Sequence, residues 1–211
     1  MFAIALSFAL AQTPMPADPF AKWEKEITAI EKKIATAKPG GIIFAGSSSI
    51  RLWDLKKSFP DWNAINVGFG GSMIPDSTHF YPKIIKPLKA KAIVFYAGDN
   101  DIGAKHTPER VRDDYAAFVQ AVRADDKAVP IYYLPIKPSV KRWAMYDTQK
   151  KANALIQEVI KKDEHQHYVD LVPLLLGKDG QPDAALFRDD GLHLNDKGYA
   201  KWNEVLRTTI K

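Results

Sequence analysis

Apolar residues recur at two kinds of spacing along the chain, and each spacing predicts a different secondary structure. Five short apolar runs, most of them closed by Gly or Pro, predict buried β-strands. These runs are residues 42–45, 64–67, 92–96, 131–134 and 168–171. Apolar residues three and four positions apart predict helices between and around the strands. The helical segments are residues 20–34, 50–55, 107–122, 152–160 and 199–206.

The alternation of strands and helices predicts the fold class. Short, continuously apolar strands separated by helices are typical of a mainly parallel sheet that is covered on both faces. We therefore expect a single α/β domain with three layers, α/β/α, and about five strands. Ligands bind beyond the carboxyl ends of the strands in such sheets. Three of the strands run into unusual loops containing Gly, Ser or Asn, at 46–49, 68–71 and 98–101, so we expect the chemistry at that edge.

Composition narrows the class of partner. The 211 residues are 46% hydrophobic, which suits one domain with a substantial core. The net charge is +5, but the basic residues are dispersed and no recognition motif accompanies them, which disfavours nucleic acid as a partner. The chain has no cysteine, so disulfides, thiolate nucleophiles and cysteine metal sites are excluded.

The N-terminal segment has the character of an export signal. Residues 1–11 are mostly apolar and end in Ala9-Leu10-Ala11, the small-x-small form of a signal-peptidase site. The segment is too short to span a bilayer, which takes about 20 apolar residues. We interpret it as a truncated signal peptide, followed by a proline-containing lead-in at 12–19 and the main domain at 20–211. This predicts a periplasmic or secreted protein without stable membrane insertion; a hydrophobic arm packed on a cytoplasmic domain is the alternative.

Several residues in the loops and near the C-terminus could do chemistry, although each has a structural explanation too. The serines at 47–49 sit where a strand turns into a helix, a position that favours negative charge but also suits an ordinary N-cap. Asp190 lies three positions before His193, so its carboxylate could orient that imidazole as a general base. Asn100 could donate to an oxyanion or only build a turn. Gly70 and Gly71 could admit a substrate to a backbone N–H or form a tight turn.

Taken together, these segments resemble the SGNH hydrolases, the broad GDSL-like esterase and acylhydrolase superfamily. Four blocks occur in family order: FAGSSSI at 44–50, NVGFGGS at 66–72, GDND at 98–101 and DGLH at 190–193. The resemblance implies a flavodoxin-like SGNH fold and a Ser48, Asp190, His193 catalytic triad. It implies an oxyanion hole formed by the Ser48 and Gly71 N–H groups and the Asn100 side chain. Ser47 departs from the pattern, because the family more often has Asp there, and Asp189 lacks the family spacing.

The resemblance implies a serine esterase that needs no cofactor. We expect it to remove short acyl groups, most simply acetate, from a carbohydrate or other small-molecule ester through an acyl-enzyme. The alternatives are a thioesterase or lysophospholipase-type acylhydrolase, and a catalytically silent carbohydrate-binding protein on the same fold.

Metal binding has little support in the sequence. His165 and His167 form an H-x-H pair, for which a helix C-terminus is the better explanation. His79 and His106 are isolated, and we expect them to be exposed. Trp143, in the segment after the fourth strand, could face the substrate or belong to an ordinary surface loop. We therefore predict no metal site.

Overall fold

A five-stranded parallel sheet forms the centre of the protein. The computed structural model describes residues 18–210, so the predicted signal segment and most of the lead-in lie outside the described residues. The strands are β1 (Ile42–Gly46), β2 (Ala64–Asn66), β3 (Ala92–Tyr96), β4 (Ile131–Tyr133) and β5 (Gln166–Tyr168). Their spatial order is β2-β1-β3-β4-β5, and every neighbouring pair is parallel. This confirms the predicted parallel α/β fold.

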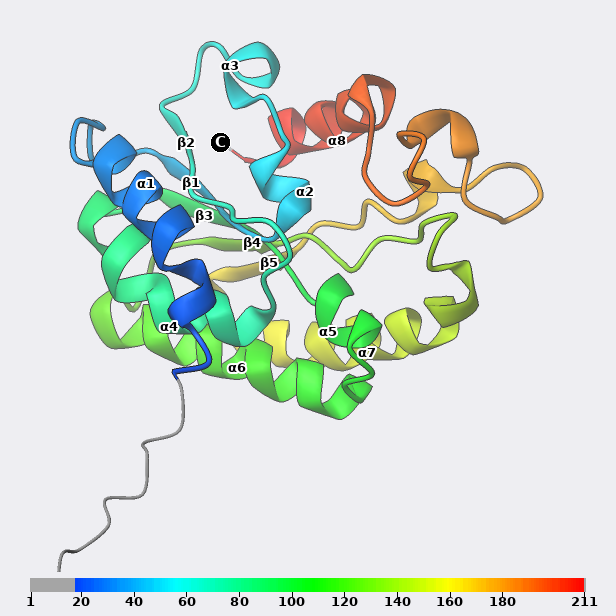
Figure 1. Ribbon diagram of the computed structural model, residues 1–211, viewed down its shortest axis with the longest axis horizontal. Coiled ribbons are helices and arrows are strands. Elements are labelled where there is room, and N and C mark those ends of the chain that lie inside the picture. Colours follow the sequence, from blue (N-terminus) through cyan, green and yellow to red (C-terminus); the bar gives the residue numbers. More distant parts are fainter. Residues whose placement is uncertain (1–17, 211) are drawn as a thin grey trace, which may run out of the picture.

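Helices cover both faces of the sheet, as Figure 1 shows. The helices on one face are α1 (Glu24–Ile34), α4 (Ile74–Ile84), α6 (Pro108–Asp125) and α7 (Tyr146–Ile160). The opposite face carries α2 (Ser48–Arg51), α3 (Leu55–Ser58) and α8 (Asp196–Thr209). The short helix α5 (Asp99–Gly103) follows β3 at the carboxyl edge. Single 3₁₀ turns lie at Ala21–Trp23, Lys86–Leu88, Trp143–Met145, Pro173–Leu175 and Ala184–Leu186.

Alternate residues of β1 to β4 supply two separate hydrophobic cores. In β3, Ile93 and Phe95 pack toward α4 and α6, whereas Val94 and Tyr96 pack toward α8. All five residues of β1 and all five of β3 are buried. Strands covered on both faces need apolar side chains on both faces, which is why these two strands read as unbroken apolar runs.

Several elements differ from the sequence prediction, including α5, which lies partly within a segment predicted as a loop. The predicted helix at 50–55 is two short helices, because Asp54 accepts a hydrogen bond from the Lys57 N–H and starts α3. The fifth strand lies at Gln166–Tyr168 and not at 168–171. Its polar first residue, Gln166, is buried and accepts a hydrogen bond from the Tyr115 hydroxyl at 2.8 Å. Helix α4, with Pro82 in its interior, has no counterpart in the prediction.

The other main helices agree well with their predicted positions. The helix predicted at 107–122 is α6, which begins at Pro108 because the Thr107 side chain accepts a hydrogen bond from the Arg110 N–H. Among the described helices, none is both long and apolar enough to cross a membrane.

Candidate active site

The three adjacent serines occupy different environments at the turn after β1. The strand ends at Gly46 and α2 begins at Ser48, so Ser47 holds the N-cap position. The Ser47 side chain makes no capping hydrogen bond, so the N-cap interpretation does not explain it. Ser47 and Ser49 are each 2% exposed, whereas Ser48 is half-buried. Ser48 is thus the serine of the three that has substantial exposure.

A continuous chain of hydrogen bonds links Ser48 to a carboxylate from the other end of the sequence. His193 Nε2 lies 3.0 Å from Ser48 Oγ, across 145 positions of sequence. His193 Nδ1 lies 2.6 Å from Asp190 Oδ2. The neighbouring Asp189 is exposed, and the carboxylate bonded to the imidazole is that of Asp190. Such an arrangement lets a histidine take a hydroxyl proton while a carboxylate stabilises the resulting imidazolium.

The carboxylate of Asp190 is held by its own loop. Its Oδ1 accepts from the backbone N–H groups of Leu192 and His193, both at 2.9 Å. Burial opposes ionisation of Asp190, but hydrogen bonds from the His193 side chain and from these two N–H groups outweigh it. They hold the pKa of Asp190 well below its usual value. Asp190 is therefore an anion at neutral pH.

Backbone hydrogen bonds join the ends of β1, β2 and β3 at this edge of the sheet. The Ser47 N–H donates to the Tyr96 carbonyl at 2.9 Å, and the Phe69 N–H donates to the Gly46 carbonyl at 3.0 Å. The Gly46 backbone has a φ of +126° and lies directly against Tyr96. The loops after the three strands are thereby fixed relative to one another.

The amide of Asn100 belongs to the same hydrogen-bonded edge. Asn100 lies in α5, and its Nδ2 donates to the Ser72 carbonyl at 3.0 Å. An amide nitrogen carries two hydrogens, so a second donor remains for a ligand. Gly71, one residue before Ser72, is exposed and has a φ of +82°, a conformation that favours glycine.

Arg142 contacts Asn100 and had no role in the sequence prediction. Its Nη2 donates to Asn100 Oδ1 at 3.2 Å, and its Nη1 donates to the Asp99 carbonyl at 2.8 Å. Nη1 also forms an ion pair with Asp99 Oδ1 at 2.8 Å. The signal available in the sequence was an arginine in the segment that follows the fourth strand, at the edge of the sheet where ligands bind.

Asp99 also receives a buried lysine. Lys137 is 1% exposed, and its Nζ lies 3.6 Å from Asp99 Oδ2. Burial lowers the pKa of Lys137, while the nearby Asp99 carboxylate acts in the opposite direction. The segment after the fourth strand is therefore not an ordinary surface loop at its start. Further along, Trp143 is half-buried and stacks on Tyr146 at 4.6 Å between ring centroids.

The environments of the histidines outside this site agree only partly with the sequence prediction. His167 lies in β5 and stacks on Tyr132, so the helix C-terminus proposed for the H-x-H pair is wrong. His79 is exposed, as expected, but His106 is half-buried, with a buried Nδ1.

The fold has many relatives among solved structures. A Streptococcus pneumonia protein provisionally described as a platelet activating factor is 23% identical, with a TM-score of 0.80 over 89% of this chain and 92% of its own. A GDSL-like lipase from Bacteroides thetaiotaomicron is 16% identical, with a TM-score of 0.70 over 91% and 97%. A carbohydrate esterase family 3 structure from Talaromyces cellulolyticus is 16% identical, with a TM-score of 0.64 over 81% and 96%.

A search of curated proteins finds no significant match. A sequence model, by contrast, matches well over half of the chain, residues 48–201, and describes a GDSL-like lipase/acylhydrolase family. The matched segment begins at the half-buried serine and includes the aspartate and histidine that are hydrogen-bonded to it. Because the match covers well over half of its length, the chain belongs to the GDSL-like lipase/acylhydrolase family.

Proposed function

We propose that the protein is a serine esterase that hydrolyses short-chain acyl esters, with acetyl esters of carbohydrates or other small molecules as its substrates. The observation that carries the proposal is the hydrogen-bond chain from Ser48 Oγ through His193 to Asp190, with distances of 3.0 and 2.6 Å. Family membership supports the hydrolysis of esters, and the chain of three side chains supports covalent catalysis by the serine.

The proposed reaction has two halves that use the same base. In the first, His193 Nε2 takes the Ser48 hydroxyl proton while Oγ attacks the ester carbonyl carbon. The tetrahedral intermediate collapses, His193 returns the proton to the leaving alcohol, and an acyl-enzyme remains. In the second, His193 takes a proton from water, the hydroxide attacks the acyl carbon, and the proton returns to Ser48 as the acid leaves. Asp190 stabilises the imidazolium in both halves.

The negative charge on the carbonyl oxygen needs donors fixed in advance. We assign them as the N–H groups of Ser48 and Gly71 and the side-chain amide of Asn100. One Nδ2 hydrogen of Asn100 is used by the Ser72 carbonyl at 3.0 Å, which leaves the other for the oxyanion. A preorganised donor of this kind typically contributes about 10²- to 10³-fold to kcat.

Two features support the substrate class and the place of action. A carbohydrate esterase is among the structural relatives, at 16% identity. The apolar residues 1–11, ending in Ala9-Leu10-Ala11, favour export to the periplasm or the medium, where acetylated polysaccharides would be accessible.

Substitution of each of two neighbouring serines tests the assignment. We expect Ser48→Ala to lower hydrolysis of p-nitrophenyl acetate by at least about 10³-fold, because the nucleophile is lost. The same variant should no longer be labelled by phenylmethylsulfonyl fluoride. Ser47→Ala is the matched control and should keep both activity and labelling. Turnover by Ser48→Ala similar to that of the unsubstituted protein would contradict the proposed mechanism.

A chain-length series tests the substrate class separately. We expect kcat/KM to be highest for the acetyl ester and to fall from acetate to long-chain p-nitrophenyl esters, and acetate to be released from acetylated xylan. A maximum at long acyl chains would favour a lysophospholipase or thioesterase and would contradict the acetyl-ester proposal, while leaving the role of Ser48 intact.

A further inference from the structure

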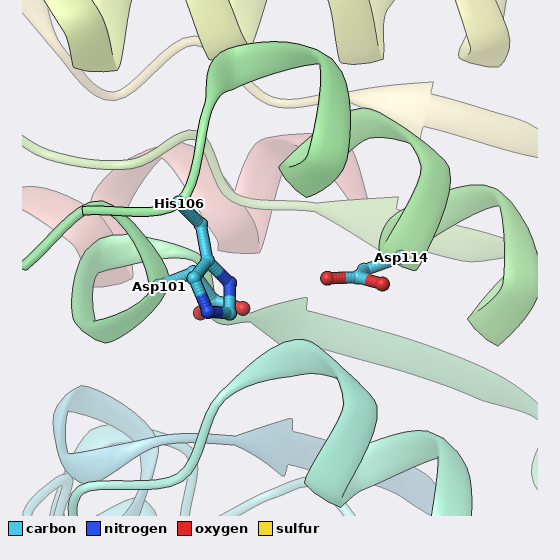
Figure 2. A group of neighbouring side chains, drawn as sticks. All are labelled: Asp101, His106 and Asp114. Atoms are coloured by element: carbon cyan, nitrogen blue, oxygen red, sulfur yellow. The ribbon is translucent and has the colours of Figure 1, made fainter. Parts of the chain in front are cut away.

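Three side chains with metal-binding atoms meet near α5, outside the proposed catalytic machinery. One ligand atom from each of Asp101, His106 and Asp114 lies within 4.8 Å of those from the other two. Asp101 comes from α5, His106 from the turn after it, and Asp114 from the second turn of α6. In Figure 2 the Asp101 carboxylate lies beside the His106 ring, and the Asp114 carboxylate points toward both from α6.

Two buried polar atoms in this group lack a partner. Asp101 is 0% exposed; its Oδ1 accepts from the Ile74 N–H at 3.1 Å, but its Oδ2 has no hydrogen-bond partner among the described residues. His106 Nδ1 is buried in the same way and also has no partner there. Buried polar atoms are almost always hydrogen-bonded or in contact with an ion or water. Because a ligand atom of Asp101 and one of His106 lie within 4.8 Å of each other, a single bound group could satisfy both residues.

The backbone holds the three side chains in place. The His106 N–H donates to the Asp101 carbonyl at 3.0 Å, which closes the turn after α5. The Thr107 side chain then caps α6, the helix that carries Asp114. The cluster is therefore built on two helix ends joined by a tight turn, and large backbone movements are not needed to bring its members together.

We propose that Asp101, His106 and Asp114 bind a divalent transition-metal cation, for which zinc is the best fit. One imidazole and two carboxylates form a donor set that zinc accepts, with water as the fourth ligand. Zinc–ligand distances of about 2.0–2.2 Å place ligand atoms roughly 3–4 Å apart, so small side-chain rotations suffice. Magnesium and calcium prefer six or more oxygen ligands, which makes the imidazole a poor partner for them.

Arg110, which lies beside the cluster, competes with a metal ion for the Asp114 carboxylate. Arg110 Nε donates to both oxygens of Asp114, at 2.8 and 2.9 Å. The Arg110 side chain is 58% exposed, so it can turn toward solvent or keep one of the two oxygens. Burial, with a smaller contribution from the Asp114 and Asp76 carboxylates, raises the pKa of Asp101 to about 7. A proton on Asp101 is thus the alternative occupant, and metal binding would displace it.

We expect the bound metal to stabilise α5. A ligand that binds the folded state and not the unfolded one raises the melting temperature. Asp101 follows Asn100 directly, so a metal at this position would hold the helix that presents the Asn100 amide. The site is separate from Ser48 and His193, and Ser48→Ala should bind zinc as the unsubstituted protein does.

Calorimetric titration of the full, chelator-treated chain with zinc chloride tests the proposal. We expect one saturable equivalent, a rise in melting temperature with zinc, and the loss of both in His106→Gln and Asp114→Asn. His167→Gln and His193→Gln are matched controls and should retain the binding. Arg110→Gln should tighten it, because a competing cation is removed.

Three results would overturn the proposal. The first is the absence of saturable binding by the unsubstituted chain, which would leave a proton as the occupant of the cluster. The second is equal binding by His106→Gln. The third is loss of binding only in His167→Gln or His193→Gln, which would place the zinc at the H-x-H pair or at the catalytic histidine.

Discussion

The side-chain amide of Asn100 has two chemically different ends, and the proposed oxyanion hole needs the nitrogen end. Arg142 can fix this choice, because a guanidinium only donates and therefore bonds the oxygen end. The observed pairing follows this rule: Arg142 Nη2 contacts Asn100 Oδ1, and Asn100 Nδ2 contacts the Ser72 carbonyl. Arg142 is a positioning residue in this interpretation, since it acts on the substrate through Asn100.

Replacing the guanidinium fork with a single ammonium group tests the role of Arg142. We expect Arg142→Lys to lower kcat roughly 10- to 100-fold with little change in KM, because lysine cannot bond Asp99 and Asn100 in the same fork geometry. The surface substitution Arg112→Lys is the control. In the double variant with Asn100→Ala, the effect of Arg142→Lys should largely vanish. Full additivity of the two substitutions would indicate a structural role only.

The residues that were predicted for the site share a property that Arg142 and Lys137 lack. Ser48, Asn100 and His193 lie in short sequence motifs. Each motif can be recognised from adjacent residues alone, and the combination of residue types is typical of a catalytic site. Arg142 reaches back 43 positions to Asp99, and Lys137 is a buried charge compensated by that same carboxylate. Contacts between distant positions leave no local pattern, and a lysine after a strand is usually solvated. The sequence therefore left open whether this segment faces the substrate or forms an ordinary surface loop.

At the scale of elements, the turn after β1 depends on close contact with β3. A Cβ built on Gly46 would lie 1.9 Å from the Tyr96 carbonyl oxygen, and Gly46 has a φ of +126°. The two strands are hydrogen-bonded neighbours, with Gly46 paired to Tyr96 in register. They cannot separate without loss of the ladder, so the glycine is required by both space and backbone conformation.

We expect Gly46→Ala to lower the free energy of unfolding by at least about 3 kcal/mol, because steric clash adds to backbone strain. Gly40→Ala is the matched control, since Gly40 has a φ of +78° but nothing within 4 Å of a built Cβ. Its cost should be about 1–2 kcal/mol, from backbone strain alone. Urea unfolding followed by circular dichroism measures both, and equal losses would show that the contact with Tyr96 is readily relieved.

Elements were predictable where burial and periodicity agree. Strand β3 lies at its predicted bounds, since all five of its side chains are apolar and buried. The strand was predicted too late in the chain because the apolar signal continues past Tyr168, the last residue of β5: Val169 and Leu171 are also buried. Helix α4 was missed because Pro82 lies in its interior, and proline disfavours a helix on local grounds alone. Packing against α1 and α6 stabilises this helix, although its local sequence does not favour one.

At the scale of the whole molecule, packing of the C-terminal helix α8 brings the first sequence motif, which contains Ser48, next to the last one, which contains His193. The Tyr199 hydroxyl of α8 donates to the Ser49 carbonyl at 2.8 Å, and Trp53 Nε1 donates to Asn203 Oδ1 at 3.0 Å. Both contacts join segments 150 positions apart in the sequence. They hold the loop before α8, which carries His193, over the turn that carries Ser48.

The same loop links the stability of the molecule to pH through Asp190. In the folded state its hydrogen bonds outweigh the effect of burial and lower the pKa of Asp190 below its ordinary value of 3.8. A lowered pKa means that the folded state favours the ionised carboxylate, so the stabilisation is fully present above about pH 4 to 5. It is lost as the pH falls from there through the folded pKa, because the unfolded state then binds the proton more readily.

Asp190→Asn isolates this contribution, because asparagine keeps an oxygen for the Leu192 and His193 N–H groups but cannot ionise. We expect the variant to have a lower melting temperature than the unsubstituted protein at pH 7, and the difference to shrink steadily below pH 4. Other carboxylates titrate in both proteins and largely cancel in the comparison. The control is Asp189→Asn, which removes an exposed charge one position away and should show a small difference at every pH. A difference in melting temperature between Asp190→Asn and the unsubstituted protein that stays constant from pH 7 to strong acid would contradict this expectation. It would mean that packing stabilises the loop, and that the charge of Asp190 acts on His193 without stabilising the fold.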